Sequence, residues 1–207
     1  GFHDAKISPQ VAVFTTFLDD HLVYYKGDTE RYFEDKTAIF KYQKKEDTLV
    51  VGEQVPRLLS SRFDLKSGKR ANLENRLKKG RTLLIARAVD VPKDWKLPLL
   101  GEHNLENVAC AIAAARAVLK TPDVGDSKHR VSEVEKIIQK AVEHFKAVPG
   151  RFEYLRTVCG VKIYNDNSAT TPDATVAALR ALRDLRFKKY DLGTHKSRIV
   201  NRKSDKN

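Results

Sequence analysis

The chain has 207 residues, of which 41% are hydrophobic and 32% charged, a balance typical of a soluble globular protein with a solvated surface. It holds no apolar run as long as a membrane span and no secretory pattern in its first residues, so we expect neither a membrane protein nor a secreted one. The formal net charge of +12 raises the question of nucleic acid binding, but no aromatic-plus-basic motif and no zinc-ligand spacing accompanies the charge.

The first part of the chain predicts alternating strands and helices, and therefore an α/β fold. Three short runs rich in β-branched and apolar residues are typical of buried strands, namely 11–15, 48–52 and 82–88. The polar segment 19–22 follows the first of them, at the strand end where ligands bind in open α/β sheets. A helix is predicted over 30–42, with Asp28 or Thr29 as its N-cap. The residues that share one face of this helix, at three- and fourfold spacing, are Tyr32, Lys36, Ile39 and Phe40.

The most informative segment is GEHNLEN at residues 101–107, which precedes an alanine-rich run at 108–118. Alanines at fourfold spacing predict a closely packed helix over that run. His103, Asn104 and Asn107 then lie at or near its N-terminus, where free backbone N–H groups and the positive end of the helix dipole favour an anion. A plain N-cap role for Asn104 is the simpler alternative, but it leaves the other two polar residues unexplained, so a ligand-binding role is favoured.

A second amphipathic helix is predicted over 131–145, followed by a break in the chain pattern. The apolar stripe of this helix consists of Val134, Ile137, Ile138, Ala141, Val142 and Phe145. Val148-Pro149-Gly150 comes next and is typical of a domain junction.

Beyond the junction, the sequence predicts a strand pair and a last helix. The strands are expected over 151–155 and 161–164, with Cys159-Gly160 as the turn. Thr171 and Pro172 suit the N-cap and first position of a helix that runs to about residue 185. Positive charge is densest near 66–81 and 183–206, and the tail after the helix lacks periodicity, so it is expected to be disordered.

The two cysteines, Cys110 and Cys159, lie far apart in the sequence in apolar or strand-like contexts. This favours buried free thiols over a disulfide. It also favours a reducing compartment, and the expected location is therefore the cytoplasm.

Three separated segments match one family in their order and spacing. The first is Asp20-His21-Leu22, with Lys36 fifteen residues after His21. The second is the 101–107 segment. The third is PGRFE at 149–153, followed by NDNSATTPDAT at 165–175. Together they resemble the Mur ligases over roughly residues 8–185. The third segment is similar to the branch of the family that adds D-glutamate, and it argues against a folylpolyglutamate synthase, a related amide ligase.

The resemblance implies roles for seven residues. His21 and Lys36 would hold magnesium, and Lys36 would be carbamylated and therefore an anionic catalytic group. The implied ATP contacts are His103, Asn104, Asn107, Arg151 and Asp166. The simpler alternatives are a locally bonded loop histidine, an ordinary surface lysine, an ion pair between Arg151 and Glu153, and a turn-capping role for Asp166.

The activity that the resemblance implies is ATP-dependent amide formation in peptidoglycan synthesis, with ATP and Mg²⁺ as cofactors. The carboxylate of UDP-N-acetylmuramoyl-L-alanine would attack the γ-phosphate of ATP, and the amine of D-glutamate would attack the resulting acyl phosphate. Such a phosphoryl transfer depends mainly on positioning and charge neutralisation, which a metal ion and an arginine supply. The positive net charge suits these anionic partners without proving them.

The implied organisation is the C-terminal part of a central ATP-binding domain over 1–147, with an incomplete sheet, the start of a Rossmann-like C-terminal domain over 148–187, and a basic tail over 188–207. The sequence contains no phosphate loop of the form GxxxxGK[ST], which the family carries upstream together with an acidic magnesium ligand. The chain begins with Gly1 and has no methionine. We therefore expect part of a longer protein that is inactive alone. Ser168 also stands where many members have a lysine, so the positive charge of that lysine is missing here.

Two hypotheses from other classes stay open. A non-catalytic remnant would keep a nucleotide-shaped pocket or only a protein interface, and substitution of Lys36 would not affect it. A basic nucleic-acid-binding protein, the less favoured of the two, would associate with DNA or RNA in a strongly salt-dependent way.

Overall fold

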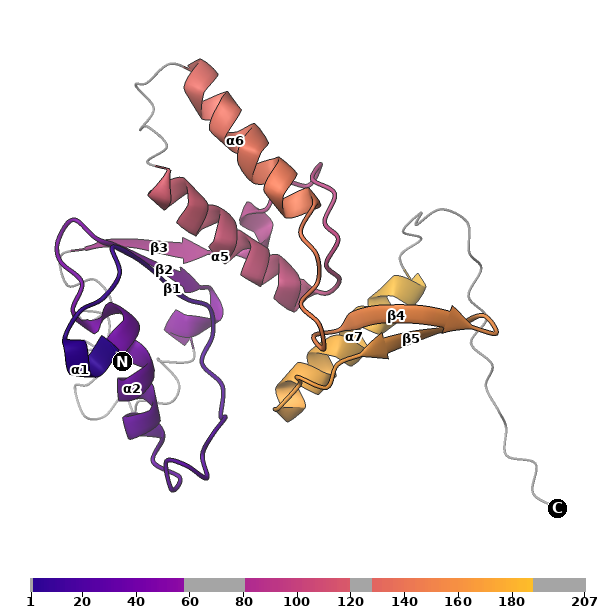
Figure 1. Cartoon of the computed structure of the whole chain (residues 1–207), viewed down its shortest axis with the longest axis horizontal. Helices are drawn as coiled ribbons and strands as arrows, with labels where there is room; N and C mark the ends of the chain where they lie inside the picture. Colours follow the sequence, from indigo (N-terminus) through magenta and orange to yellow (C-terminus); the bar gives the residue numbers. More distant parts are fainter. Residues whose placement is uncertain (1, 58–80, 120–127, 188–207) are drawn as a thin grey trace. The chain divides into compact units, whose positions relative to one another are not determined.

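The computed structural model describes residues 2–57, 81–119 and 128–187, and the chain divides into two compact units, Gly1–Phe145 and Lys146–Asn207 (Figure 1). The division falls close to the domain start predicted at residue 148. Most of the basic stretch at 66–81 and the tail at 188–207 lie outside the described residues. No helix in the described ranges combines the length and the apolar character needed to cross a bilayer.

The first unit is built on a parallel sheet of three strands, in agreement with the predicted α/β class. Its strands are β1 (Val11–Phe14), β2 (Thr48–Gly52) and β3 (Thr82–Ala86), in the order β1-β2-β3. All three predicted strands are confirmed. The third is shorter than expected because the chain turns into a 3₁₀ helix, η2 (Ala88–Asp90), soon after Ala86.

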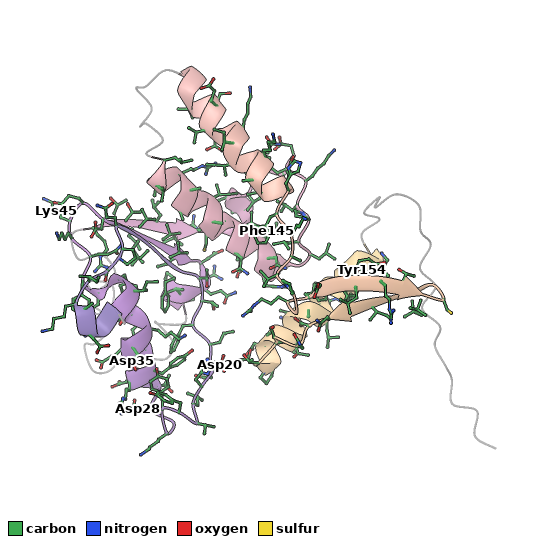
Figure 2. All side chains as sticks on the ribbon, viewed as in Figure 1. Asp20, Asp28, Asp35, Lys45, Phe145 and Tyr154 are labelled. Atoms are coloured by element: carbon green, nitrogen blue, oxygen red, sulfur yellow. The ribbon has the colours of Figure 1, made fainter. Side chains whose placement is uncertain are left out.

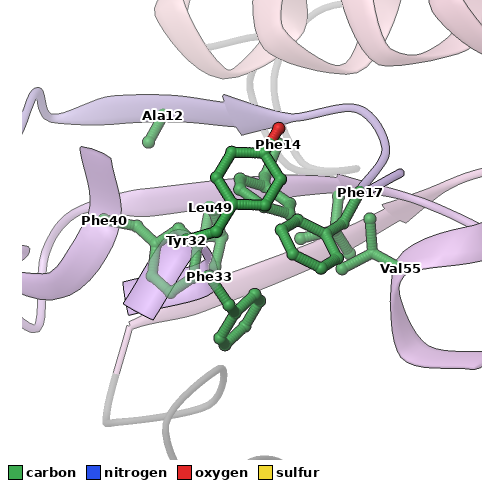
Figure 3. Close-up of a cluster of buried hydrophobic side chains, with 9 residues drawn as sticks. Ala12, Phe14, Phe17, Tyr32, Phe33, Phe40, Leu49 and Val55 are labelled. Atoms are coloured by element: carbon green, nitrogen blue, oxygen red, sulfur yellow. The ribbon is translucent and has the colours of Figure 1, made fainter. Parts of the chain in front are cut away.

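The central strand β2 divides the interior into two hydrophobic cores. Leu49, Val50 and Val51 have no exposed surface, and their side chains alternate between the two faces of the sheet. Leu49 and Val51 belong to an aromatic core with Phe14 and Phe33, shown in Figure 3. Val50 belongs to the other core, on the opposite face. A strand buried on both faces needs a helix on each side, which is the usual environment of a parallel strand.

Helix α2 (Thr29–Lys41) supplies the aromatic side of the first core. Asp28 is its N-cap, because the Asp28 carboxylate accepts a hydrogen bond of 2.9 Å from the backbone N–H of Arg31. Tyr32 and Phe40, on the face predicted from their spacing, are buried, whereas Lys36 on the same face is exposed. A short helix, α1 (Phe2–Ala5), precedes β1 and contacts α2.

Helix α5 (Glu102–Val118) covers the other face of the sheet and buries Val108, Ala109 and Ile112 there. It begins six residues before the predicted alanine-rich run. Helix α6 (Lys128–Glu143) packs beside it, and the Arg116 guanidinium donates to both Glu135 carboxylate oxygens at 2.7 and 2.8 Å.

The predicted apolar stripe of α6 is too wide. Val134, Ile138 and Val142 pack into the second core, as expected. The other three residues of the stripe, Ile137, Ala141 and Phe145, are exposed.

Buried polar side chains close the amino edge of the sheet. The Gln43 side-chain amide donates to the carbonyl oxygens of Pro9 and Thr48, at 3.0 and 2.8 Å. The Arg81 guanidinium in turn donates to the Gln43 side-chain oxygen at 3.1 Å and to the Phe40 carbonyl oxygen. These bonds satisfy backbone groups that would otherwise be buried without partners.

The second unit contains the predicted strand pair and last helix. Strands β4 (Glu153–Val158) and β5 (Val161–Asn165) are antiparallel. Helix α7 (Pro172–Phe187) buries Ala178 and Ala181. The N–H of Ala174 donates to the Thr171 hydroxyl at 3.3 Å, so the predicted cap is confirmed, although the helix ends two residues later than expected.

The two cysteines differ in environment. Both are free thiols, as predicted, and Cys110 is buried in α5, where desolvation raises its pKa to about 11. Cys159 is exposed, so the prediction of burial is wrong for it. Cys159 and Gly160 both have positive φ angles, at 49° and 79°, and form the tip of the β4–β5 turn, which faces solvent.

Gly52, at the carboxyl end of β2, is required by a close backbone approach. A Cβ atom there would overlap the carbonyl oxygen of Thr15, which follows β1. We expect Gly52→Ala to lower the free energy of unfolding by about 1–3 kcal/mol, the usual cost of overpacking. Urea unfolding followed by the fluorescence of Trp95, the single tryptophan, measures this.

Gly27→Asn is the matched control for that substitution. Gly27 has a φ of +80° and open space around its Cα, and asparagine tolerates this backbone region. The free energy of unfolding of Gly27→Asn should therefore stay close to that of the wild type. Equal losses in the two variants would contradict a requirement for space at Gly52.

Candidate functional site

His21 lies on the loop that leaves the carboxyl end of β1. Its backbone is left-handed, with a φ of +56°, and its N–H donates to the Asp20 carboxylate at 2.8 Å. The imidazole Nε2 lies 3.4 Å from the second Asp20 oxygen, and the side chain is 59% exposed. Asp20 therefore fixes the turn while the ring stays accessible from solvent. Figure 2 labels Asp20 on this loop, Asp28 at the N-cap of α2 and Asp35 on the helix.

Lys36 and His21 both contact the ring of Tyr32. The Lys36 ammonium lies 5.4 Å from the centroid of that ring, and the His21 imidazole meets the ring edge-on with 6.3 Å between centroids. Tyr32 itself is 5% exposed and packs on Phe17. Two residues fifteen positions apart are thus brought to one buried aromatic side chain.

The chemistry of this pair limits which metal site it can form. The described residues contain no group of three or more histidine, cysteine or carboxylate side chains that could hold a metal ion. An ammonium repels a cation, so Lys36 in its ordinary form cannot act as a ligand. A carbamate on Lys36 would supply anionic oxygens, the ligand type that Mg²⁺ prefers, next to the tyrosine ring that the His21 imidazole also contacts.

The polar residues of the 101–107 segment lie in the first turns of α5. Gly101, with a φ of +94°, takes the N-cap position without a side-chain hydrogen bond. Asn104 donates through its side-chain amide to the Leu100 carbonyl oxygen at 2.7 Å. The simple capping role for Asn104 is therefore wrong. His103 and Asn104 are half-buried and Asn107 is exposed.

A hydrogen-bonded bridge, missed from the sequence, holds this end of α5 at the carboxyl edge of the sheet. The Gln54 side-chain amide donates to the Glu106 carboxylate at 2.6 Å, and the Thr16 hydroxyl donates to the Gln54 side-chain oxygen at 3.0 Å. Thr16 follows β1 and Gln54 follows β2. The bridge places His103, Asn104 and Asn107 near the ends of both strands. The carboxyl-edge rule gives the only sequence signal for it, because the three partners are far apart in the chain.

The two remaining motifs, in the second unit, pack against each other. The N–H of Ser168 donates to the Gly150 carbonyl oxygen at 2.9 Å, and a Cβ atom at Gly150 would overlap the side-chain oxygen of Asn167. The N–H of Phe152 donates to the Asp166 carboxylate at 2.9 Å. The Asp166 carboxylate thus links its own segment to the backbone next to Arg151, and its contact with the nucleotide stays a prediction.

The Arg151 side chain takes no part in the hydrogen bonds just described. The Glu153 carboxylate accepts from the Gly150 N–H at 2.8 Å and from the Asn165 side-chain amide at 3.4 Å. No ion pair joins Glu153 to Arg151 within the part of the chain that the structure describes, so the alternative role of Arg151 is not seen. Its side chain is exposed.

The family follows from comparison with known proteins. Residues 3–115 match the family model described as the Mur ligase middle domain, which is more than half of the chain. The chain therefore belongs to the Mur ligase family, and the parallel sheet with flanking helices is part of the fold of that domain.

Named relatives narrow the comparison further. The chain is 34% identical over 181 residues to the UDP-N-acetylmuramoylalanine–D-glutamate ligase of Clostridium kluyveri, and 30% identical over 186 residues to that of Prochlorococcus marinus. These matches cover 84% and 86% of this chain but 36% of each relative. The chain thus spans little more than a third of the length of these relatives.

Solved structures of the family share the fold. MurF from Acinetobacter baumannii matches with a TM-score of 0.59 and 17% identity, over 88% of this chain and 39% of that one. MurF from Thermotoga maritima, in complex with ADP, matches with a TM-score of 0.58 and 22% identity, over 88% of this chain and 41% of that one. At these identities the matches show the fold alone.

The Glu106 bridge has a consequence for stability. Burial raises the pKa of the Glu106 carboxyl, as do Glu102 and Glu53, against the opposing hydrogen bond from Gln54. The folded chain therefore holds this proton more tightly than the unfolded chain does. The contribution of Glu106 to the free energy of unfolding falls as the pH rises from its ordinary pKa through the raised one.

We expect Glu106→Gln to remove this fall, because glutamine does not ionise and can still accept from Gln54. Urea unfolding followed by Trp95 fluorescence, from about pH 4 to about pH 7, measures the effect. Glu102→Gln, at an exposed residue of the same helix, should keep most of the fall in unfolding free energy with rising pH. The same pH dependence in the wild type and in Glu106→Gln would refute the raised pKa.

Proposed function

We propose that this chain supplies the metal- and nucleotide-binding part of an ATP-dependent ligase that joins D-glutamate to UDP-N-acetylmuramoyl-L-alanine in peptidoglycan synthesis in the cytoplasm. The observation that carries the proposal is the meeting of His21 and Lys36 at Tyr32. The names of the relatives at 30–34% identity support the choice of substrates. The PGRFE and NDNSATTPDAT segments support it further, because they match the D-glutamate-adding branch.

In this proposal, His21 and a carbamylated Lys36 hold Mg²⁺. The ion would neutralise charge on the phosphates during transfer. The carbamate requires the neutral amine of Lys36 to react with carbon dioxide. Tyr32 then fixes the separation of the two ligands, since both contact the same buried ring.

The nucleotide contacts proposed for the first unit lie on α5, and those proposed for the second unit are Arg151 and Asp166. His103, Asn104 and Asn107 would contact ATP from the first turns of α5, which the Glu106 bridge holds at the carboxyl edge. Arg151 would donate two parallel hydrogen bonds to phosphate oxygens, a task for which the planar guanidinium is suited. Asp166 would contribute by holding the backbone next to Arg151, and its direct contact with the nucleotide stays a prediction.

The reaction then needs little covalent chemistry from the protein. The substrate carboxylate attacks the γ-phosphorus and ADP leaves, which gives an acyl phosphate. The amine of D-glutamate attacks the acyl carbon, phosphate leaves, and the amine loses a proton. The residues of this chain position the two reactants and balance their negative charge.

A chimaera tests the assignment directly. Residues 8–187 of this chain replace the matching segment of the Clostridium kluyveri ligase, and phosphate release is measured with ATP, Mg²⁺, UDP-N-acetylmuramoyl-L-alanine and D-glutamate. We expect D-glutamate-dependent release that Lys36→Ala reduces at least about a hundredfold, because it removes a metal ligand. Lys41→Ala is the matched control, since Lys41 is an exposed lysine of the same helix that contacts a tyrosine ring.

A chimaera that folds, as judged by circular dichroism, and releases no phosphate would count against the ligase. So would a Lys36→Ala variant as active as Lys41→Ala. Phosphate release that depends on another amino acid would support the ligase family but contradict D-glutamate as the substrate.

The chain by itself should behave differently. Because its sequence contains no GxxxxGK[ST] loop, we expect the purified 207-residue chain to release no phosphate above background in the same assay. Turnover that depends on D-glutamate would show that this sequence suffices for catalysis.

A further inference from the structure

The side chain of Gln54 connects three elements at the carboxyl edge of the sheet. Its amide nitrogen donates to the Glu106 carboxylate on α5 at 2.6 Å, and its oxygen accepts from the hydroxyl of Thr16, which follows β1, at 3.0 Å. An ionised carboxylate only accepts hydrogen bonds, so the amide nitrogen must face Glu106 and the amide oxygen must face Thr16. The orientation of the Gln54 amide is therefore determined by its two partners.

The backbone on both sides of Gln54 is held by the sheet and the core. The N–H of Glu53 donates to the carbonyl oxygen of Ala86, at the end of β3, at 3.0 Å. Val55 has no exposed surface and belongs to the aromatic core shown in Figure 3. Gln54 itself is half-buried. Its side chain thus extends from a fixed point at the end of β2.

On the β1 side, Gln54 is linked to the loop that carries His21. Phe17, the residue after Thr16, is 2% exposed, and its ring lies 5.0 Å from that of Tyr32 on α2. The His21 imidazole contacts the same Tyr32 ring. The segment 16–21 is therefore packed on α2 at Phe17 and at His21, and it is joined towards α5 through the hydrogen bond from Thr16 to Gln54.

On the α5 side, the bond to Gln54 crosses from the helix to the sheet. Gly101 occupies the N-cap position without a side-chain hydrogen bond. The Asn104 amide donates to the Leu100 carbonyl oxygen, which lies in the same segment, so this bond cannot set the helix against the sheet. The Glu106 carboxylate does bond across the gap, and it lies between Asn104 and Asn107 in the chain.

We infer that Gln54 is a positioning residue that sets the first turns of α5, with Asn104 and Asn107, against the loop that carries His21. The importance of this spacing for ligand binding rests on the proposed function, in which the loop holds the metal ion and the helix contacts the nucleotide. The placement itself does not rest on it, because it follows from the two hydrogen bonds of Gln54.

The test replaces Gln54 by methionine in the full chain, which keeps the length of the side chain and removes both bonds. Nuclear magnetic resonance follows the side-chain amides of Asn104 and Asn107, and we expect both signals to move. The N–H of Leu105, which donates to a carbonyl oxygen in the first turn of α5, is followed by amide exchange. It should exchange about tenfold faster relative to the amide of Val50 in the central strand, as for the loss of one hydrogen bond to a charged group.

Two comparisons separate a role in positioning from general damage. The ring signals of His21 should stay at their wild-type shifts in Gln54→Met, because the loop remains packed on Tyr32. Gln139→Met is the matched control. The half-buried Gln139 amide also donates to a carboxylate, that of Glu143 at 3.0 Å, but both residues belong to α6. This variant should change none of the signals.

An exchange of the two bonded side chains tests the bridge more sharply. Gln54→Glu alone places two carboxylates opposite each other, and their repulsion should move the α5 signals at least as far as Gln54→Met does. Adding Glu106→Gln should restore the wild-type signals, because the carboxylate at position 54 then accepts from the Thr16 hydroxyl and from the amide at position 106. Glu106→Gln alone keeps both bonds and should change little.

Thr16→Val removes the link to the loop and leaves the bond between Gln54 and Glu106 in place. We expect it to move the two asparagine signals less than Gln54→Met does. Combining the two substitutions should add nothing to Gln54→Met, because that substitution already removes both bonds.

An ATP titration in the presence of Mg²⁺, followed by the same asparagine amides, connects the placement to the proposed nucleotide site. We expect Gln54→Met to weaken ATP binding about tenfold, as for the loss of about one well-placed hydrogen bond, and the exchanged pair to recover the wild-type affinity. Wild-type chain whose Asn104 and Asn107 signals do not respond to ATP would remove the nucleotide role in the proposed function. The signals of the variants without ATP would still decide the placement.

Three results would overturn the inference itself. One is an unchanged set of Asn104 and Asn107 signals in Gln54→Met. The second is movement of the His21 ring signals together with those of the asparagines, because Gln54 would then only support the unit as a whole. The third is failure of Glu106→Gln to restore the signals in the Gln54→Glu background.

Discussion

The complete burial of β2 is the constraint on which the first unit depends. A parallel strand with both faces covered must place alternate side chains in two separate cores, and each core needs its own helix. Leu49 and Val51 therefore pack against α2, and Val50 packs on the side of α5. The two helices that carry Lys36 and the polar residues of the 101–107 segment are thus also the two that cover the sheet.

This arrangement explains why Thr16, Gln54 and Glu106 meet at the carboxyl edge of the sheet. Both the loop after β1 and the chain after β2 emerge at the carboxyl ends of the strands, where α5 also begins its contact with the sheet. His21 then returns to α2 through Tyr32, and Glu106 is fixed through Gln54. The site is held by packing and hydrogen bonds of the sheet and its helices, so its geometry is coupled to that of the core.

The strands could be predicted because each is a short apolar run between polar turns. The start of α5 could not, because five of the six residues 102–107 are polar and Gly101 provides no capping side chain. Cys159 was misplaced because its apolar neighbours suggest burial, whereas a tight hairpin turn places its tip in solvent. The local sequence pattern thus predicts whether a segment is a helix or a strand. The residues at which the element begins and ends depend on the geometry of its termini.

The candidate site was predicted only in part. The residue pattern alone gives Lys36 no role, since an exposed helical lysine is ordinary, and only the family resemblance paired it with His21. The bridge through Glu106 was missed because it consists of tertiary contacts between residues that no sequence period relates.

The buried Gln43–Arg81 pair at the amino edge has an evolutionary consequence. It satisfies the polar groups at the start of the strands from within the first unit, at the edge opposite the site. Changes in the exposed loop that follows β1 leave that closure intact. Selection can therefore exchange exposed residues of the loop after β1 and alter what the protein recognises. The buried pair at the amino edge meanwhile keeps the fold unchanged.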